Sequence, residues 1–188
     1  MIKFFQRYNF KTSLKFAKLK IGHSPLTPFT MHKCQKISLF LLRLGFGWLF
    51  LYAGLTKVMN PEWSAAGYLE SAKTFSGFYQ WLASDAILPI TNFLNEWGQI
   101  ALGVSLILGL FTRLSGYLGA LMMALYYLPA LDFPYPNAHS FIVDEHILYG
   151  LALIYMAEAK AGNIWGLNPW CAKLPLCKKF PKLRAWLG

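Results

Sequence analysis

The sequence contains few charged residues and few cysteines for its size. Only 14% of its 188 residues are charged, whereas 56% are hydrophobic and 17% are aromatic. A soluble domain usually carries about 25% charged residues, so this composition excludes a disordered chain and argues against a soluble domain. The 3 cysteines are too few for a disulfide-stabilised scaffold. We therefore expect an all-α integral membrane protein.

Sequence motifs for the common redox and nucleotide cofactors are missing as well. The chain has no C-x-x-C pair, no glycine-rich phosphate loop and no G-x-S-x-G nucleophile elbow. Only His146 falls within a long apolar segment, which excludes a haem held by two histidines, and Cys171 and Cys177 match no usual zinc spacing. We predict no haem, iron–sulfur, flavin or metal site. Any redox carrier is then a diffusible quinone or the cofactor of a partner.

Acidic residues are absent from residues 1–61, and the positive charge is concentrated toward the two ends of the chain. Eight Lys or Arg residues lie within residues 1–36 and six follow from Lys160 onward, which accounts for the net charge of +10. These residues flank apolar segments and form no nucleic-acid-binding motif. We expect them to contact anionic lipid headgroups, and we expect no nucleic-acid partner. Whether Met1 or Met31 is the true start is left open.

Four apolar segments are long enough to cross the hydrocarbon core of a bilayer, which is about 30 Å thick. They cover residues 37–59, 90–111, 114–131 and 141–159. An even number of spans places both termini on one side, and the Lys and Arg residues near the termini mark that side as cytoplasmic. The sequence thus predicts a four-transmembrane-helix bundle at residues 37–160, between basic cytoplasmic tails at 1–36 and 161–188. The expected location is the cytoplasmic (plasma) membrane of a prokaryote, as a multi-pass protein.

The segment between the first two predicted spans is rich in aromatic residues. Asn60, Pro61 and Glu62 have the pattern of a helix N-cap, a first-turn proline and an acid near the helix start. Six Trp, Tyr or Phe side chains follow between residues 63 and 81, and such side chains favour the membrane–water interface. We expect a cap of short interfacial helices. The alternative is an ordered loop that serves stability alone.

Ionisable and polar side chains inside the predicted spans form two layers. The layer toward the cytoplasm holds Arg43, Arg113 and Glu158, for which we expect ion pairs, although both arginines are also long enough to reach the headgroups. The opposite layer consists of Lys57, Glu96, Gln99, Tyr126, Asp144, Glu145 and His146. Residues 144, 145 and 146 lie about 100° apart around a helix, so at most two of them should face the bundle. This layer is either a functional pocket or an arrangement of ion pairs that supports the bundle.

Several short motifs resemble those of one family of membrane proteins. They are LLRLGFGWLFLYAGLTKVMNPEW at residues 41–63, LILGLFTR at 106–113, VDEHIL at 143–148 and AGNIWGLNPW at 161–170. These strings are similar to motifs of the DoxX/DoxD family, and the last two resemble its thiosulfate:quinone oxidoreductase version in particular. Asn168 stands where the related tail has Asp. The resemblance, over residues 37–170, implies a four-helix membrane protein linked to respiratory quinones, and its namesake complex oxidises thiosulfate to tetrathionate.

Two hypotheses about function come from different classes of protein. The first is a membrane subunit of a quinone-linked oxidoreductase, with thiosulfate as the candidate substrate and a second redox subunit as the expected partner. Its expected catalytic residues are Glu96, Asp144 and His146, which exchange protons with the quinone. Its expected quinone-binding residues are Lys57, Gln99 and Tyr126. The second hypothesis is a non-catalytic membrane anchor for a soluble redox or sulfur-handling partner. Membrane lipid is a partner in both, and association between copies of the chain is left open.

Overall fold

The protein is described by a computed structural model that covers residues 31–171 and 173. The regular elements of these residues are all helices, so the all-α prediction is confirmed. The long ones are α1 (Lys33–Val58), α4 (Leu88–Leu108), α5 (Thr112–Ala130) and α6 (Glu145–Glu158). The short ones are α2 (Ala66–Glu70), α3 (Ser76–Leu82), the 3₁₀ helix η1 (Ala161–Asn163) and α7 (Asn168–Cys171). What was expected of residues 1–30 and 174–188 lies outside the described residues.

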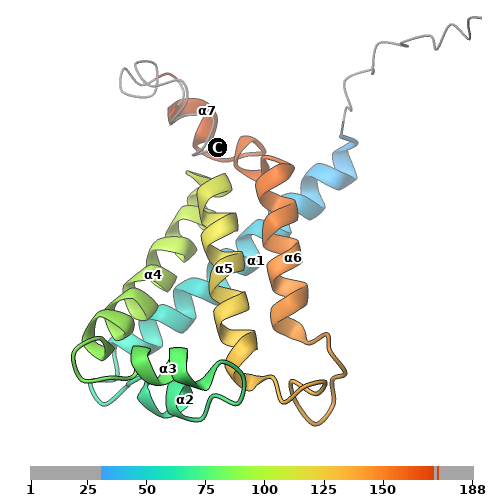
Figure 1. The fold of residues 1–188 in the computed structure, drawn as a ribbon. Helices are drawn as coiled ribbons and strands as arrows, with labels where there is room; N and C mark the ends of the chain where they lie inside the picture. Colours follow the sequence, from blue (N-terminus) through green and yellow to red (C-terminus); the bar gives the residue numbers. More distant parts are fainter. Residues whose placement is uncertain (1–30, 172, 174–188) are drawn as a thin grey trace, which may run out of the picture. The chain divides into compact units, whose positions relative to one another are not determined.

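The long helices pack mainly in two pairs. α1 packs along α4 and α5 packs along α6, while α4 and α5 follow one another through a tight turn. α2 and α3 lie at one end of the bundle with the loop between α5 and α6, and α7 lies at the other end (Figure 1). We call residues 60–87 the cap and residues 161–171 the C-terminal hook. The two ends of the bundle are named the cap end and the hook end after them.

The paired helices approach each other so closely that glycine is required at the contacts. A Cβ atom on Gly103 of α4 would lie 2.5 Å from the backbone nitrogen of Leu51 in α1. In the other pair, a Cβ atom on Gly116 of α5 would lie 2.7 Å from the carbonyl oxygen of Leu153 in α6. Such close backbone contacts between helices are typical of membrane proteins.

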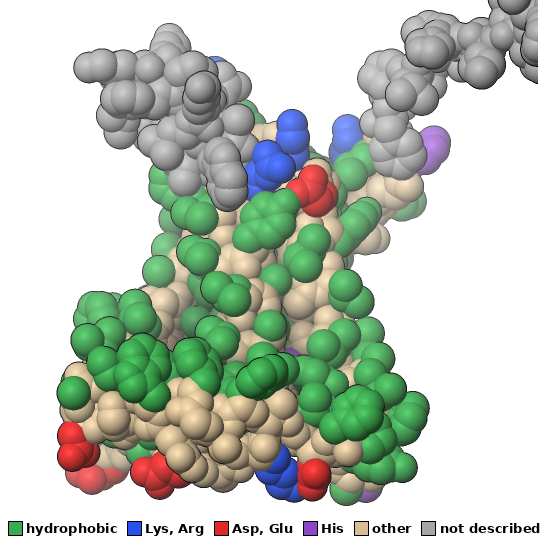
Figure 2. All heavy atoms as spheres, viewed as in Figure 1, with side chains coloured by type: hydrophobic (Ala, Val, Ile, Leu, Met, Phe, Trp, Pro, Cys, Tyr) green, Lys and Arg blue, Asp and Glu red, His purple; other side chains and the backbone are tan. Residues whose placement is uncertain are grey.

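Hydrophobic side chains cover the middle of the bundle. Figure 2 shows them on the face in view, with charged side chains gathered toward the two ends. One helix of the described residues, Lys33–Val58, is long and apolar enough to cross a membrane, with a mean hydropathy of 1.6. Polar residues such as Asn95 and Gln99 interrupt the apolar sequence of α4, although the helix itself is continuous. The 14 residues of α6 extend only about 21 Å. The four membrane spans therefore stay a prediction.

The helices begin at different residues from those expected. α6 begins at Glu145 and not at residue 141, because Asp144 is extended (φ −121°) and caps the helix. The helix start expected at Asn60 is wrong: Asn60 Oδ1 accepts a hydrogen bond from the backbone N–H of Glu62 at 3.2 Å, which closes a turn, and α2 begins only at Ala66. Residues 33–36, expected in the N-terminal tail, form the first turn of α1.

The cap contains the expected short helices, α2 and α3, and packs on the end of α5. Its buried core consists of Ala65, Leu69, Ala72 and Tyr79. The Tyr79 hydroxyl donates to the carbonyl oxygen of Leu125 at 3.1 Å, and the Thr74 hydroxyl donates to that of Leu131 at 2.6 Å. The cap is therefore fixed to the bundle by hydrogen bonds as well as by apolar contacts. Its position at a membrane interface stays a prediction.

A buried arginine holds the C-terminal hook against the bundle. Arg43 of α1 is fully buried, and its Nη1 donates to the carbonyl oxygens of Ala161 at 2.7 Å and Ile164 at 3.0 Å. Its Nη2 donates to the carbonyl oxygen of Trp165 at 3.3 Å. Left-handed backbone at Trp165 (φ 48°) turns the chain so that these carbonyl groups face the guanidinium. Arg43 thus has backbone partners in the hook where an ion pair with Glu158 was expected.

Residues 161–171 were expected in a tail, and the structure packs them into the fold instead. Asn168 is buried; its Oδ1 accepts from the backbone N–H of Phe111 at 3.0 Å, and its Nδ2 donates to Thr112 Oγ1 at 3.3 Å. An amide can both accept and donate, whereas an ionised Asp at this position could only accept. At the same end, Arg113 Nη2 lies 3.5 Å from Glu158 Oε1, on a partly exposed surface.

Candidate functional site

A cavity of about 430 Å³ lies at the cap end of the bundle. Its volume is within the range of about 300–1,000 Å³ that is usual for small-molecule sites. α1, α4, α5 and α6 contribute to its walls, together with the cap and the loop between α5 and α6. The side chains that line it are mostly polar or aromatic: Lys57, Trp63, Ser64, Tyr68, Asn95, Tyr126, Asn137, Asp144, Glu145 and His146, with Ala65, Ala130 and Pro136.

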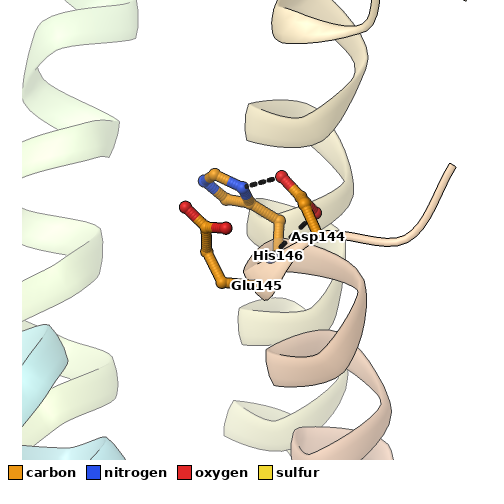
Figure 3. A group of neighbouring side chains, drawn as sticks. All are labelled: Asp144, Glu145 and His146. Atoms are coloured by element: carbon orange, nitrogen blue, oxygen red, sulfur yellow. Dashed lines mark hydrogen bonds and ion pairs between the residues drawn. The ribbon is translucent and has the colours of Figure 1, made fainter. Parts of the chain in front are cut away.

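His146 and Asp144 form a hydrogen-bonded pair on the α6 side of the cavity. His146 Nδ1 lies 2.8 Å from Asp144 Oδ2 (Figure 3). The other carboxylate oxygen, Asp144 Oδ1, accepts from the backbone N–H groups of His146 at 3.0 Å and Ile147 at 3.2 Å. An ionised Asp144 can only accept, so it places the proton of a neutral imidazole on Nδ1 and leaves Nε2 as an acceptor.

The expectation that Asp144, Glu145 and His146 diverge around a helix is wrong. One potential ligand atom from each lies within 4.8 Å of the others. The expectation assumed helical backbone throughout, whereas Asp144 precedes the helix as its extended N-cap. Three atoms so close together could share a cation. However, Asp144 already accepts three hydrogen bonds and the ammonium of Lys57 lines the same cavity, so the arrangement favours Asp144 as the group that orients His146.

A partly buried chain of hydrogen bonds lies beside the cavity and joins α1, α4 and α5. Lys57 Nζ donates to Gln99 Oε1 at 2.7 Å, and Gln99 Nε2 donates to the hydroxyl of Tyr126 at 3.1 Å. Lys57 Nζ also lies 3.4 Å from the carbonyl oxygen of Ala53 and 5.3 Å from the ring centre of Trp63. The lysine ammonium is thus contacted by dipoles and by an aromatic face within the described residues. Gln99 itself is 3% exposed and does not line the cavity.

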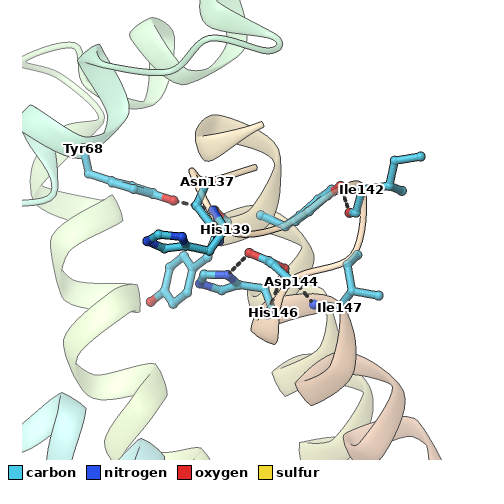
Figure 4. Close-up of polar contacts among 9 residues, drawn as sticks. Tyr68, Asn137, His139, Ile142, Asp144, His146 and Ile147 are labelled. Carbon is cyan, nitrogen blue, oxygen red and sulfur yellow. Dashed lines mark hydrogen bonds and ion pairs between the residues drawn. The ribbon is translucent and has the colours of Figure 1, made fainter. Parts of the chain in front are cut away.

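Tyrosine side chains connect this chain to the cap and to His146. The hydroxyl of Tyr68 donates to the backbone oxygen of Tyr126, and the rings of Tyr126 and His146 meet edge to face, with centres 6.2 Å apart. Figure 4 shows Tyr68 of the cap and His146 of α6 pointing into the same space. Burial and the nearby negative charge of Asp144 raise the pKa of Tyr68 above its ordinary value. On the cap side, the phenol of Tyr68 is therefore part of the cavity lining.

The structure gathers most of the residues selected from the sequence around one cavity. Lys57, Tyr126, Asp144 and His146 line it, while Gln99 lies behind Tyr126. Glu96 does not line it, although its charge acts on Lys57. Further residues of the lining were not selected: Trp63, Tyr68, Asn95 and Asn137. The aromatic cluster of residues 63–81 pointed to the first two, whereas nothing in the sequence distinguished Asn95 or Asn137.

Comparison with known proteins identifies the family. Searches of curated proteins and of solved structures gave no match to this chain. The DoxX family model matches residues 38–131, which reach from α1 to the end of α5 and make up half of the chain. Of the cavity, Lys57, Asn95 and Tyr126 fall within the matched part, whereas Asp144 and His146 follow it. The protein therefore belongs to the DoxX family of membrane proteins.

Proposed function

We propose that this DoxX protein is a membrane subunit of a quinone-linked oxidoreductase and that the cap-end cavity binds the quinone head group. The observation that carries the proposal is the His146–Asp144 pair, which lies beside Tyr126 in the lining of a cavity of small-molecule size. Quinone reduction takes up protons, and an imidazole can both donate and accept a proton, so a histidine suits proton exchange at this position. Membership of the DoxX family supports the membrane location.

The proposed roles follow from the contacts of each side chain. His146 exchanges a proton with a quinone oxygen through Nε2, because Nδ1 is occupied by Asp144. Asp144 is a positioning residue, since its oxygens are taken up by the imidazole and the start of α6. Lys57 adds positive charge that favours reduced, anionic forms of the quinone. Glu96, which does not line the cavity, partly offsets that charge.

We further propose that α1, α4, α5 and α6 all cross the cytoplasmic membrane, with the hook end on the cytoplasmic side. The long helices and the apolar middle of the bundle support this arrangement. Reporter fusions at Gly188 and within residues 71–78 should report opposite sides of the membrane. Matching signals at the two positions contradict the four-span topology.

Quinone that co-purifies with the protein tests the proposed ligand. The wild-type protein, extracted in mild detergent, should retain quinone that chromatography detects. His146→Ala and Tyr126→Phe should retain much less, whereas His32→Ala, a change at the N-cap of α1, should retain as much as the wild type. Equal quinone content in all of these proteins, or none in the wild type, contradicts quinone binding in this cavity.

Thiosulfate is the proposed electron donor of the complex. Two thiosulfate ions joined by an S–S bond release two electrons, and the quinone takes up these electrons and two protons. Membranes containing the wild-type protein should reduce quinone when thiosulfate is added, and His146→Ala should slow this by about 100-fold, as for a lost acid–base group. If the protein binds quinone but thiosulfate does not cause its reduction, thiosulfate is ruled out as the electron donor, while the proposed quinone site is still supported.

A further inference from the structure

The orientation of one buried amide determines the direction of the hydrogen-bond chain beside the cavity. A protonated lysine can only donate, so the group of Gln99 that lies 2.7 Å from Lys57 Nζ must be its oxygen. The amide nitrogen of Gln99 then faces Tyr126 at 3.1 Å and donates to its hydroxyl oxygen. The positive charge on Lys57 therefore makes Tyr126 the acceptor at the end of the chain.

Tyr126 has one further polar neighbour, which leaves its own proton available. Asn95 lines the same cavity as Tyr126, and its Oδ1 is buried with no hydrogen-bond partner among the described residues. The phenol oxygen receives an N–H group from Gln99, and its own O–H has no acceptor within the part of the chain that the structure describes. Because Tyr126 lines the cavity, a bound ligand can supply that acceptor.

From this geometry we infer that Gln99 is a positioning residue. Because Lys57 holds its oxygen, Gln99 donates to Tyr126 and leaves the Tyr126 hydroxyl to donate a hydrogen bond to the ligand. The cavity therefore recognises a ligand with an acceptor oxygen. Gln99 does not line the cavity and reaches it through its hydrogen bonds to Tyr126 and Lys57, which both do. The inference rests on the proposed function, and a quinone carbonyl is an oxygen of this kind. His146 Nε2, beside Tyr126 in the same lining, is then the acceptor for the O–H proton of a quinol, the reduced form of that ligand.

The variant Gln99→Glu reverses the chain with almost no change in shape. A carboxylate keeps the contact with Lys57, but it can only accept, so Tyr126 has to donate to it and loses its donor function toward the ligand. Tyr126→Phe removes the same donor directly. Gln80→Glu, an exposed change in α3, adds the same charge away from the cavity and is the matched control. Thermal unfolding of each full-length protein in detergent verifies that it is folded.

Binding of a short-chain benzoquinone to these proteins is the first measurement. Gln99→Glu and Tyr126→Phe should each weaken binding by about tenfold, the effect of one lost hydrogen bond, and the double variant should bind no more weakly than either single one. The infrared carbonyl band of the bound quinone should shift equally in both single variants. The inference is overturned if Gln99→Glu binds the quinone as tightly as the wild type while Tyr126→Phe binds it more weakly. It is also overturned if Tyr126→Phe has no effect on binding, or if the double variant loses as much affinity as the two single variants combined.

A second measurement needs no ligand and separates the inference from the proposed function. Ultraviolet resonance Raman spectra distinguish a tyrosine that accepts hydrogen bonds from one that donates, and subtraction of the Tyr126→Phe spectrum isolates Tyr126. In the ligand-free wild type, Tyr126 should be an acceptor, and in Gln99→Glu it should be a strong donor. This result together with no quinone binding rejects the proposed ligand and supports the role of Gln99. A donor signal in the ligand-free wild type overturns that role.

Discussion

The replacement of Asp144 by asparagine separates the two roles of this residue. In the wild type, Oδ1 caps α6 through two backbone N–H groups, while Oδ2 holds His146 Nδ1 at 2.8 Å. Asparagine is also a good N-cap, so its oxygen keeps the first contact at a cost of a few tenths of a kcal/mol. Its amide nitrogen takes the place of Oδ2, and because this nitrogen donates, it drives the imidazole proton from Nδ1 to Nε2.

The expected magnitudes follow from these contacts. Asp144→Asn replaces a hydrogen bond to a charged group by a neutral one, which should lower the free energy of unfolding by about 1 kcal/mol. Asp144→Ala also removes the cap, worth about 1 kcal/mol, and leaves buried groups unpaired, so its total loss should be about 3 kcal/mol. Despite its greater stability, Asp144→Asn should lose quinone-linked proton exchange almost as fully as His146→Ala, since Nε2 can no longer accept.

Unfolding in detergent and nitrogen NMR of labelled histidine provide the assay. The wild type should show the proton on Nδ1 of neutral His146, and Asp144→Asn should show it on Nε2. Activity and stability should rank the variants differently: Asp144→Ala is the least stable, whereas both changes at Asp144 impair activity. If Asp144→Asn keeps the proton on Nδ1, or if Asp144→Ala is as stable as Asp144→Asn, the reasoning about this pair is refuted.

Further predictions concern the packing and titration of the bundle. Arg43→Gln should lower the free energy of unfolding by about 2–4 kcal/mol, because carbonyl groups of the hook lose their hydrogen-bond donor. In the same unfolding assay, Arg113→Gln should lower it by less than about 1 kcal/mol, because the pair with Glu158 is partly exposed. Gly103→Ala should destabilise the protein by about 1–3 kcal/mol, because its Cβ would lie 2.5 Å from α1. The control Gly98→Ala, where the nearest atom is 3.5 Å away, should have little effect on the melting temperature. Burial raises the pKa of Tyr79 from 10.0 to about 12, so its contribution to stability should be complete below pH 10 and lost as the pH rises through about 12. Unfolding curves for the wild type and Tyr79→Phe should converge over that interval.

Periodicity and hydropathy predict the helices better than the site. The apolar segments predicted the positions of α1, α4, α5 and α6. Polar residues inside these segments, such as Lys57 and His146, could be selected because they are unusual there. The spacing of these residues along the chain follows from the sequence. Whether they line the same cavity depends on how each helix is rotated about its axis, which the sequence pattern does not determine. Asp144 was misjudged for a local reason, since a capping residue departs from helical backbone and turns its carboxylate toward His146.

The partners of Arg43 show a second limit of the sequence. Its acceptors are backbone carbonyl groups, which every residue possesses, so no side chain marks Ala161 or Ile164 as a partner. Sequence reasoning therefore assigned Arg43 to the nearest suitable carboxylate and assigned the hook to a basic tail. Asn95 was not selected for a related reason. It is an uncharged residue next to Glu96, and only the structure shows that it lines the cavity.

The contact between Arg43 and the hook also constrains the order in which the protein is made. Arg43 is synthesised 118 residues before Ala161, its first acceptor. During that interval its guanidinium has to remain hydrated, because burial of an unpaired charge is costly. α1 can therefore reach its final position only after the last long helix has been translated and the hook has folded back. A chain that ends at residue 160 contains all four long helices but none of the carbonyl groups that accept from Arg43.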